Sequence, residues 1–340
     1  MSELVIVIAD LYLDPEADAA APLPGDLALE GIGPLTRFAR REPLERSWRE
    51  WAARWLGLER YAAVPPASVA AAALPAPPAA QSVWLAEPLH LTEGVGRVHL
   101  ERRGRLRLAR AERERLAEQF NALYAGSGWS LAALQRGGFV LGAPGAERVD
   151  TCEPARLPAR TLAQCLPSGP GAPALRRLGA ELEMWLHDHP LNAERAVRGE
   201  PPVSTLWIWG GGAPPATPLP GAAARGAIHG AEGYLAGLAR LAGSECREAP
   251  PEWPYAPGAP IGRALQVLEV SEALRREPRF DLLAAVADLD RRWIAPAVAA
   301  LGAGRLDQLW LLANDRAWCL RPRDRWRRWR RGRAGLEALA

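Results

Sequence analysis

Two aspartates follow apolar stretches that are typical of buried strands, and a carboxylate in that place can hold a metal ion. Asp10 comes just after the β-branched run at residues 4–8, and Asp315 follows the apolar run at residues 306–312. Continuous apolar strands indicate a parallel sheet covered on both faces, and open sheets of this kind bind ligands at the carboxyl ends of their strands. A second interpretation of Asp10 is a cap on the turn that follows it, which is a common role of aspartate.

The stretch at residues 189–212 joins a helix, a strand and a glycine turn. Pro190 ends the preceding helix or begins a new one, and the apolar, aromatic run at residues 206–209 predicts a buried strand. Glycines directly after a strand let the backbone turn sharply or approach another group closely. The pattern leaves a tight turn and a ligand site open as alternatives. The glycines concerned are Gly210, Gly211 and Gly212.

The elements that must position these residues follow from hydrophobic periodicity. Residues 109–124 predict an amphipathic helix, and residues 282–301 predict an apolar helix interrupted by Pro296. Residues 226–243 are mostly helical, and their internal glycines indicate close packing against another element. Further strands are expected at residues 83–85 and 139–141, and a hairpin across residues 97–108.

Composition narrows the class of protein. The chain has 340 residues, a formal net charge of +3 and no lysine, so that every basic side chain except histidine is arginine. This length suits one large domain or two ordinary ones, and the near-balanced charge is not that of a nucleic-acid binder.

Cysteine spacing and apolar segments address the compartment. Cys152, Cys165, Cys246 and Cys319 are scattered without CxxC spacing, which argues against a zinc or redox motif and favours thiols in a reducing cytoplasm. The first ten residues contain acids and no basic segment, unlike a signal peptide. The uncharged segment at residues 61–86 is alanine-rich and broken by prolines, so we expect no membrane span. The sequence predicts a cytoplasmic protein.

The segment at residues 321–333 is rich in arginine and contains Trp326 and Trp329. Arginine interleaved with tryptophan can bind a nucleic-acid backbone or an acidic partner. The second interpretation is a terminal amphipathic helix whose tryptophans pack on the sheet. Because the patch is short and the whole-chain charge is modest, we favour the helix and do not expect nucleic-acid binding.

The stretch at residues 189–212 resembles the archaeal type of cofactor-independent phosphoglycerate mutase. That family carries His-Pro-Val-Asn, an arginine three residues on, and later Trp-Leu-Trp-Gly-Gln-Gly; here the chain reads His189-Pro190-Leu191-Asn192, Arg195 and Leu206-Trp207-Ile208-Trp209-Gly210-Gly211-Gly212. Weaker likenesses continue over most of the chain after position 84, including Gln135-Arg136 and Arg225-Gly226-Ala227-Ile228. Bacterial regulatory proteins of the RpfE type, whose motif ends Trp-Leu-Trp-Gly-Gly-Gly, are more similar still.

The resemblance implies an α/β fold with an alkaline-phosphatase-like core, in which helices flank a mainly parallel sheet. It also implies a smaller inserted α+β domain. On this basis we expect the core to comprise residues 1–85 and 204–340 and the inserted domain to comprise residues 86–203.

In the mutases, two divalent metals held by Asp, His and Ser activate a serine that carries the phosphoryl group. Asp10 falls at the first metal aspartate, and Asp315 lies near the last Asp-His pair, but Arg316 replaces the histidine. Ser68 is the only nearby candidate for the nucleophile, and it lacks the family's Gly-Ser-Asp context. Two metals with a total charge of +4 need more anionic or imidazole ligands than this set supplies.

The anion-binding positions of the family are better retained. Arg136, Arg195 and Arg225 match basic positions of the mutases, and the arginine fork suits a phosphate or a carboxylate. Asn192 is expected to hold its loop or a ligand hydroxyl.

These residues favour a non-catalytic regulatory or binding protein on a mutase scaffold, without a cofactor, that senses a small phosphorylated metabolite. The first alternative is an active phosphoglycerate mutase-like isomerase or phosphohydrolase that uses a divalent metal such as Mn or Mg. The second is an interaction module that binds a protein partner through the Arg/Trp-rich segment.

Overall fold

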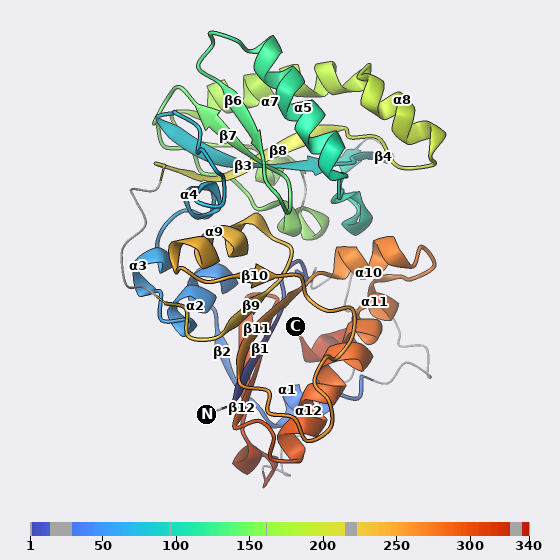
Figure 1. Ribbon diagram of the computed structural model, residues 1–340. Helices are drawn as coiled ribbons and strands as arrows, with labels where there is room; N and C mark the ends of the chain where they lie inside the picture. Colours follow the sequence, from blue (N-terminus) through green and yellow to red (C-terminus); the bar gives the residue numbers. More distant parts are fainter. Residues whose placement is uncertain are drawn as a thin grey trace. The chain divides into compact units, whose positions relative to one another are not determined.

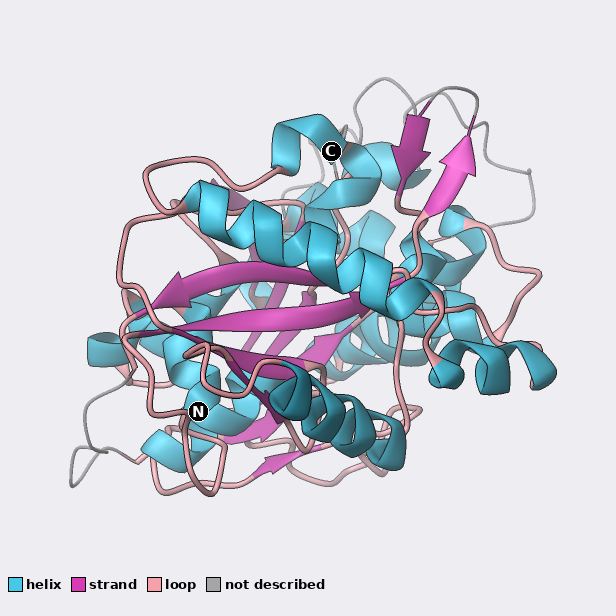
Figure 2. Cartoon of the chain, turned by 90° about the horizontal axis from the view of Figure 1, so that it is seen from above, coloured by secondary structure: helices cyan, strands magenta, loops and turns pink. Residues whose placement is uncertain are grey.

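The computed structural model describes residues 2–13, 29–94, 97–160, 162–214, 223–326 and 335–339. The chain divides into two compact units, each of which is described by itself. The first unit contains Met1–Gly57, Ala224–Gly230 and Cys246–Ala340, and the second unit contains Leu58–Ala223 and Ala231–Glu245. Figure 1 labels the helices and strands, and Figure 2 distinguishes helix, strand and loop.

The first unit is built on a mostly parallel sheet. The strands from β10 to β12 run parallel, and β13 and β2 add two antiparallel pairings at one edge. Every residue of β1 is buried, as the apolar run at residues 4–8 predicts, and the carboxylate of Glu3 at its start pairs with Arg263 at 2.8 Å. Among the described residues the sheet has seven strands in the order β10 (Cys246–Arg247), β9 (Ala227–His229), β11 (Arg263–Leu268), β1 (Glu3–Ile8), β12 (Gln308–Ala313), β13 (Arg316–Leu320) and β2 (Arg40–Pro43).

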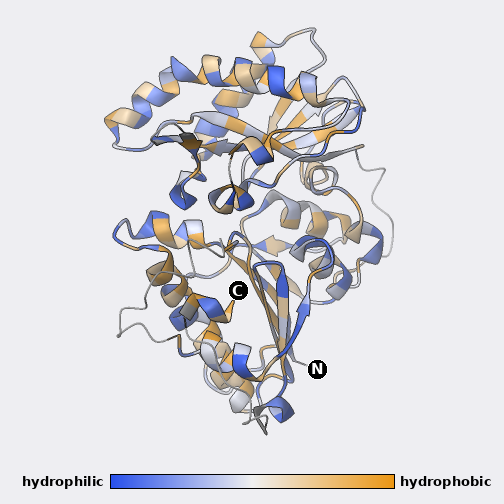
Figure 3. Cartoon of the chain, turned by 180° about the vertical axis from the view of Figure 1, so that it is seen from behind, coloured by the Kyte–Doolittle hydropathy of each residue, from blue (hydrophilic) through white to orange (hydrophobic). Residues whose placement is uncertain are grey.

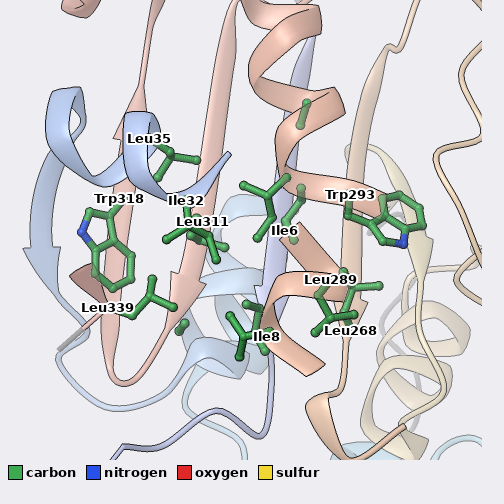
Figure 4. Close-up of a cluster of buried hydrophobic side chains, with 14 of the residues drawn as sticks. Ile6, Ile8, Ile32, Leu35, Leu268, Leu289, Trp293, Leu311, Trp318 and Leu339 are labelled. Atoms are coloured by element: carbon green, nitrogen blue, oxygen red, sulfur yellow. The ribbon is translucent and has the colours of Figure 1, made fainter. Parts of the chain in front are cut away.

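Helices flank this sheet on both faces. On one face Ile6, Leu311 and Trp318 point into a core shared with helical side chains such as Trp293 (Figure 4). Because side chains alternate along a strand, Trp310 lies on the other face, where its ring meets that of Trp51 with centroids 4.9 Å apart. The helices of the first core are α1 (Ile32–Phe38), α10 (Val270–Arg276), α11 (Leu282–Leu289) and α12 (Ala295–Gly302), and Trp51 belongs to α2 (Trp48–Trp55).

The predicted interruption at Pro296 takes the form of a π-helical segment. Asp290–Ile294 joins α11 to α12, and the N–H of Ala295 donates to the carbonyl of Asp290. Proline lacks an N–H and cannot continue the ladder of the preceding helix, so a widened turn precedes it. Pro296 itself lies in the first turn of α12, where its missing N–H is tolerated.

The second unit is built on an antiparallel sheet with the order β6 (Ser130–Ala133), β7 (Phe139–Ala143), β3 (Ser82–Leu89) and β8 (Thr205–Gly212). The predicted strands at residues 83–85, 139–141 and 206–209 are therefore confirmed as parts of β3, β7 and β8. Adjacent residues face opposite sides, because Ile208 joins one apolar cluster and Trp207 and Trp209 join the other.

Helices pack against both faces of this second sheet. The cluster around Ile208 includes side chains of α5 (Arg110–Leu123), α7 (Ala172–His187) and α8 (Pro190–Val197). The cluster around Trp207 includes α4 (Pro66–Ala71), which also packs on α9 (Gly233–Leu241). Hydrophilic and hydrophobic residues are mixed along the helices, as expected of amphipathic elements (Figure 3). The smaller elements of the second unit are α3 (Glu59–Ala62), α6 (Leu162–Cys165) and the 3-10 turns Arg102–Gly104 and Pro154–Ala159. The first unit has the 3-10 turns Pro322–Trp326 and Gly335–Ala338.

The observed boundaries differ from the predicted domains 1–85 with 204–340 and 86–203. The predicted division separates β8 from the end of β3, yet residues of β3 pair with Thr205 to Gly212 in one sheet. Residues 58–85 and 204–223 therefore belong to the second unit, together with α9. Local sequence patterns identify strands but do not reveal which distant strand each one pairs with.

Three local predictions need correction. Residues 226–243 are not one helix, because Ala227–His229 forms β9 and only Gly233–Leu241 is helical. The hairpin joins β4 (Thr92–Gly94) to β5 (Arg97–His99), whereas Gly104 lies in a 3-10 turn. In the Arg/Trp-rich segment Pro322–Trp326 is a 3-10 turn, and residues 327–334, including Trp329, lie outside the described residues.

The lengths and polarity of the helices bear on whether any of them could span a membrane. Within the described ranges, every helix is too short or too polar to cross a bilayer.

Helix packing in the second unit provides a stability test. A Cβ atom added at Gly237 of α9 would overlap the carbonyl oxygen of Val69 in α4, whereas one added at Gly179 of α7 would meet nothing within 4 Å. We expect Gly237→Ala to lower the free energy of unfolding by about 2 kcal/mol or more, because the helices must move apart. Gly179→Ala should raise it by about 0.5–1 kcal/mol, since alanine favours the helix. Urea denaturation measures both changes, and equal effects would contradict the packing argument.

Candidate functional site

Asp10 caps a helix that is remote in the sequence. The backbone N–H groups of Val270 and Ser271 donate to its two carboxylate oxygens, at 2.6 and 2.9 Å. Asp10 is buried at the carboxyl end of β1, and α10 begins just beyond β11, which is the neighbouring strand. The first N–H groups of a helix have no partner inside the helix, so an ionised carboxylate there satisfies donors and complements the helix dipole. The structure thus shows that Asp10 caps a helix that is distant from it in the sequence.

Asp290 caps the N-terminus of α1 in the same way. The N–H groups of Gly31 and Ile32 donate to its carboxylate oxygens at 2.9 and 2.7 Å. Burial raises the pKa of Asp290, and the two backbone donors oppose that rise. A side chain at Gly31 would overlap the backbone where the π-helical segment meets α12. Sequence reasoning missed Asp290. The sequence places it shortly before Pro296, but the π-helical turn that aims it at α1 is visible only in the structure.

Asp315 lies in the two-residue turn between β12 and β13. Asn314 and Asp315 both have positive φ, at 47° and 56°, and Ala313 pairs with Arg316 across the turn. Two successive residues with positive φ are typical of a type I′ hairpin, which favours Asn, Asp and Gly. The side chain of Asn314 accepts from the N–H of Leu13 and donates to the carbonyl of Leu339. These residues hold three segments of the first unit together.

The donor set does not fit a two-metal centre. Both oxygens of Asp10 accept hydrogen bonds from α10, and Asp315 is followed by an arginine. The described part of the chain contains no group of three or more His, Cys, Asp or Glu side chains placed to hold a metal ion. Each divalent cation would require several oxygen or imidazole ligands.

Ser68 lies inside the second unit on α4. Its side chain is only 1% exposed, and its hydroxyl donates to the carbonyl of Ala213, just beyond β8. A serine nucleophile needs a base within hydrogen-bond reach and access to the substrate. The hydrogen bond described for Ser68 instead fastens α4 to the end of β8.

Gly210, Gly211 and Gly212 lie within β8, not after it as the sequence predicted, and they allow the end of the strand to pass very close to its neighbours. A Cβ atom at Gly211 would overlap the indole of Trp84, and one at Gly212 would overlap Pro65. Gly210 has a φ of +64°, and its N–H donates to the hydroxyl of Thr151 at 3.0 Å. The register shifts at this point, which makes Gly210 and Gly211 part of a β-bulge. Close packing therefore explains why glycine occupies these three positions.

His189 and Asn192 serve as local clamps at the start of α8. Nδ1 of His189 accepts from the N–H of Leu191 at 3.1 Å, so His189 acts as the N-cap. The amide of Asn192 donates to the carbonyls of Leu186 and Val203 and accepts from the N–H of Val203. The Asn192 side chain therefore imitates a strand partner for the segment that leads into β8.

Arg195 is enclosed in an ion-pair network. Its side chain is 4% exposed, and Nη1 lies 3.1 Å from Oε1 of Glu112 and 3.1 Å from Oε2 of Glu200. Nε donates to the carbonyl of Pro201 at 2.8 Å. Glu112 also accepts from the N–H of Ala109, which caps α5. Arg195 thus joins α8 to the N-terminus of α5, and its fork is already engaged. Sequence reasoning missed Glu112, although its place three residues after Ala109 is typical of a capping glutamate.

The three arginines of the predicted anion site are divided between the units. Arg136 is half-buried in the turn between β6 and β7, beside the first residue of α9. Arg225 is exposed in the first unit, where its side chain lies beside Gly57. Arg195 belongs to the second unit, as Arg136 does, so the predicted anion site has two of its arginines in the second unit and one in the first.

Comparison with known proteins gives only distant likenesses. No protein-family model and no curated protein matches the sequence. The structure is similar to the cofactor-independent phosphoglycerate mutase from Thermoplasma acidophilum DSM 1728, with 16% identity and a TM-score of 0.37, over 94% of this chain and 90% of the other. It is also similar to the PH0037 protein from Pyrococcus horikoshii, with 14% identity and a TM-score of 0.41, over 94% and 87% of the two chains. Likenesses at this level decide nothing about activity.

The role of Arg195 can be tested by stability. Arg195→Met removes the buried one of the two arginines that pair with Glu112, while Arg198, whose Nη2 lies 2.6 Å from Oε1 of Glu112, remains. We expect the free energy of unfolding to fall by about 2 kcal/mol, because the substitution also leaves the carbonyl of Pro201 without its guanidinium donor. Arg115→Met is the matched control, because Arg115 pairs with Glu194 across the same two helices at the surface and should remain near wild type. Urea denaturation measures both variants. A fully stable Arg195→Met would contradict a structural role.

His189 predicts a pH dependence of stability. Burial, and secondarily the charge of Arg115, lowers the pKa of His189 below its ordinary value. The unfolded chain then binds more protons, so stability is complete above about pH 6.5 and falls as the pH drops toward the lower folded pKa. The slope from one histidine is at most about 1.4 kcal/mol per pH unit. His189→Asn keeps a capping acceptor but does not titrate, so it should be less sensitive than wild type between about pH 7 and pH 5. Equal slopes in urea melts would contradict this assignment.

Proposed function

We propose that this chain is a non-catalytic regulatory or binding protein of the RpfE type, built on a degenerate phosphoglycerate mutase scaffold. In this proposal the first unit corresponds to an alkaline-phosphatase-like core, and part of the second unit corresponds to the inserted domain. The sequence likeness at residues 189–212 supports the scaffold. The contacts of Asp10 and Ser68 support the loss of catalysis, and the capping of α10 by both Asp10 oxygens is the observation that carries it.

Phosphoryl transfer places two demands on such a scaffold. It needs a nucleophile that can reach the phosphoryl group and cations that neutralise the charge that develops on it. The hydroxyl of Ser68 is buried and donates to a backbone carbonyl, so an attack would first have to break the packing of α4 on β8. A cation at Asp10 would compete with the two N–H groups that its carboxylate already binds. The contacts of Ser68 and Asp10 therefore favour a structural role for the two residues that stand at the mutase's nucleophile and metal positions.

The retained arginines favour a small phosphorylated or carboxylated metabolite as the ligand. Arg195 is enclosed by Glu112 and Glu200, so this proposal assigns the anion contact to Arg225, with Arg136 as a further basic side chain of the mutase-like pattern. Arg225 is exposed, and its planar fork matches two oxygens of a phosphate or a carboxylate. A protein partner remains the alternative ligand of this proposal, with the Arg/Trp-rich segment as its contact.

Activity provides the main test. Incubation of the full chain with 3-phosphoglycerate and Mn²⁺ or Mg²⁺, followed by phosphorus NMR, should give no 2-phosphoglycerate above the protein-free control. Metal-dependent turnover that disappears both in Asp10→Asn and in Ser68→Ala, with each variant folded by circular dichroism, would overturn the proposal in favour of an active isomerase.

Ligand binding is measured in the same preparation. We expect 3-phosphoglycerate to raise the thermal unfolding midpoint, because a ligand that binds only the folded chain stabilises it by mass action. Arg225→Gln should reduce the shift, and Arg115→Met is a matched control that removes a surface arginine from another region. A shift that is unchanged in Arg225→Gln would exclude this arginine as an anion contact.

A further inference from the structure

Two cysteines that are well separated in sequence meet in the second unit. The Sγ atoms of Cys152 and Cys165 lie 2.7 Å apart, and both residues are free thiols. A disulfide joins sulfur atoms at about 2.05 Å, so little movement separates this contact from a covalent bond. Cys246 and Cys319 lie in the first unit, where Cys246 donates to a backbone carbonyl and Cys319 accepts from Gln308.

The two cysteines lie near the ends of one segment, residues 150–168, which the structure describes except at residue 161. Asp150 and Ser168 exchange two backbone hydrogen bonds, of 2.8 and 3.0 Å, that bring the ends of the segment together. Cys165 is 1% exposed at the end of α6 and belongs to the same apolar cluster as Trp207 and Trp209. Cys152 is partly exposed. Cys165 is therefore held in the core, and Cys152 is the more exposed cysteine of the pair.

The same segment holds the bulged end of β8. The hydroxyl of Thr151 accepts from the N–H of Gly210 at 3.0 Å, and the carbonyl of Cys152 accepts from the indole N–H of Trp207 at 2.8 Å. A bond that fixes Cys152 therefore also restrains both hydrogen bonds to β8, the one at Cys152 and the one at the neighbouring Thr151. The cysteine pair is placed where a covalent link would fasten residues 150–168 to the sheet.

We propose that Cys152 and Cys165 form a reversible disulfide that fastens residues 150–168 onto β8. The oxidant is a small-molecule disulfide of the glutathione class. One cysteine thiolate attacks it, forms a mixed disulfide and releases one glutathione thiolate. The second cysteine then attacks the protein sulfur of the mixed disulfide and releases the second glutathione. The protein loses two electrons and two protons, which the two glutathione thiols gain.

The surroundings of Cys152 set the rate of this reaction. Burial and the contact with Cys165 raise the pKa of Cys152 to about 12. The thiolate is the nucleophile, so the reactive fraction at neutral pH is small. The disulfide should form slowly near neutral pH and faster as the pH rises. The reduced state is accordingly stable against brief oxidation.

The test uses the full chain with oxidised glutathione, followed by alkylation of free thiols and digestion with trypsin. Arg156 and Arg160 lie between the two cysteines, so cleavage there leaves their peptides joined only if the disulfide has formed. We expect a Cys152–Cys165 linked peptide that is about two mass units lighter than the sum of its reduced parts. Cys246→Ser is the matched control and should keep the link, whereas Cys152→Ser should lose it.

Hydrogen exchange of the backbone amides measures how the disulfide changes the fold around β8. In the oxidised chain the amide of Gly210 should exchange several-fold more slowly than in the reduced chain, because its acceptor on Thr151 is fixed. Absence of the linked peptide across a pH series, or links that join either cysteine to Cys246 or Cys319, would overturn the proposed disulfide. Unchanged exchange at Gly210 in a fully oxidised sample would overturn its role in fastening β8.

Discussion

Buried helix ends need partners for their first N–H groups, and carboxylates supply them at decisive points of this chain. Asp10 caps α10 and Asp290 caps α1, in each case across the first unit. A buried donor without a partner costs about 1–3 kcal/mol, so each of these carboxylates supports the helix that it caps. The position of Asp10 at the end of a parallel strand is therefore explained by structure, even though the same position is typical of a ligand site.

The stretch at residues 189–212 follows the same logic in the second unit. His189 caps α8, Asn192 fixes the segment that enters β8, and Arg195 anchors α8 to Glu112. The glycines at its end let β8 pass against Trp84 and α4. A pattern that looks chemical from its residue types is used here to hold two helices and a strand in register. The residue types of this motif are therefore explained by packing and hydrogen bonding in the second unit.

The sequence predicts elements with a strong local signature better than it predicts partnerships. The apolar runs of β1 and β8 were sufficient to locate both strands, since a buried strand needs an uninterrupted apolar run. The pairing of β3 with β8, which moves the domain boundaries, depends on residues far apart in the chain. The cap on α10 joins residues 260 positions apart, and no local period encodes it. The thiol contact at Cys152 is equally hidden, since its partner lies 13 residues away in a segment without periodicity. The types of the candidate site residues were visible from the start, but their hydrogen-bond partners were not.

The place of β1 between β11 and β12 has a consequence for synthesis on the ribosome. All six residues of β1 are buried, and both neighbouring strands lie more than 250 residues later in the sequence. At about 5–20 residues per second, translation takes roughly 13–50 s to supply the first of these neighbours. During that interval the apolar residues 4–8 of β1 lack both neighbouring strands, and an unpaired apolar strand favours aggregation of nascent chains. Because β12 is the later of the two neighbours in the sequence, both edges of β1 can be paired only after Gln308–Ala313 has been made.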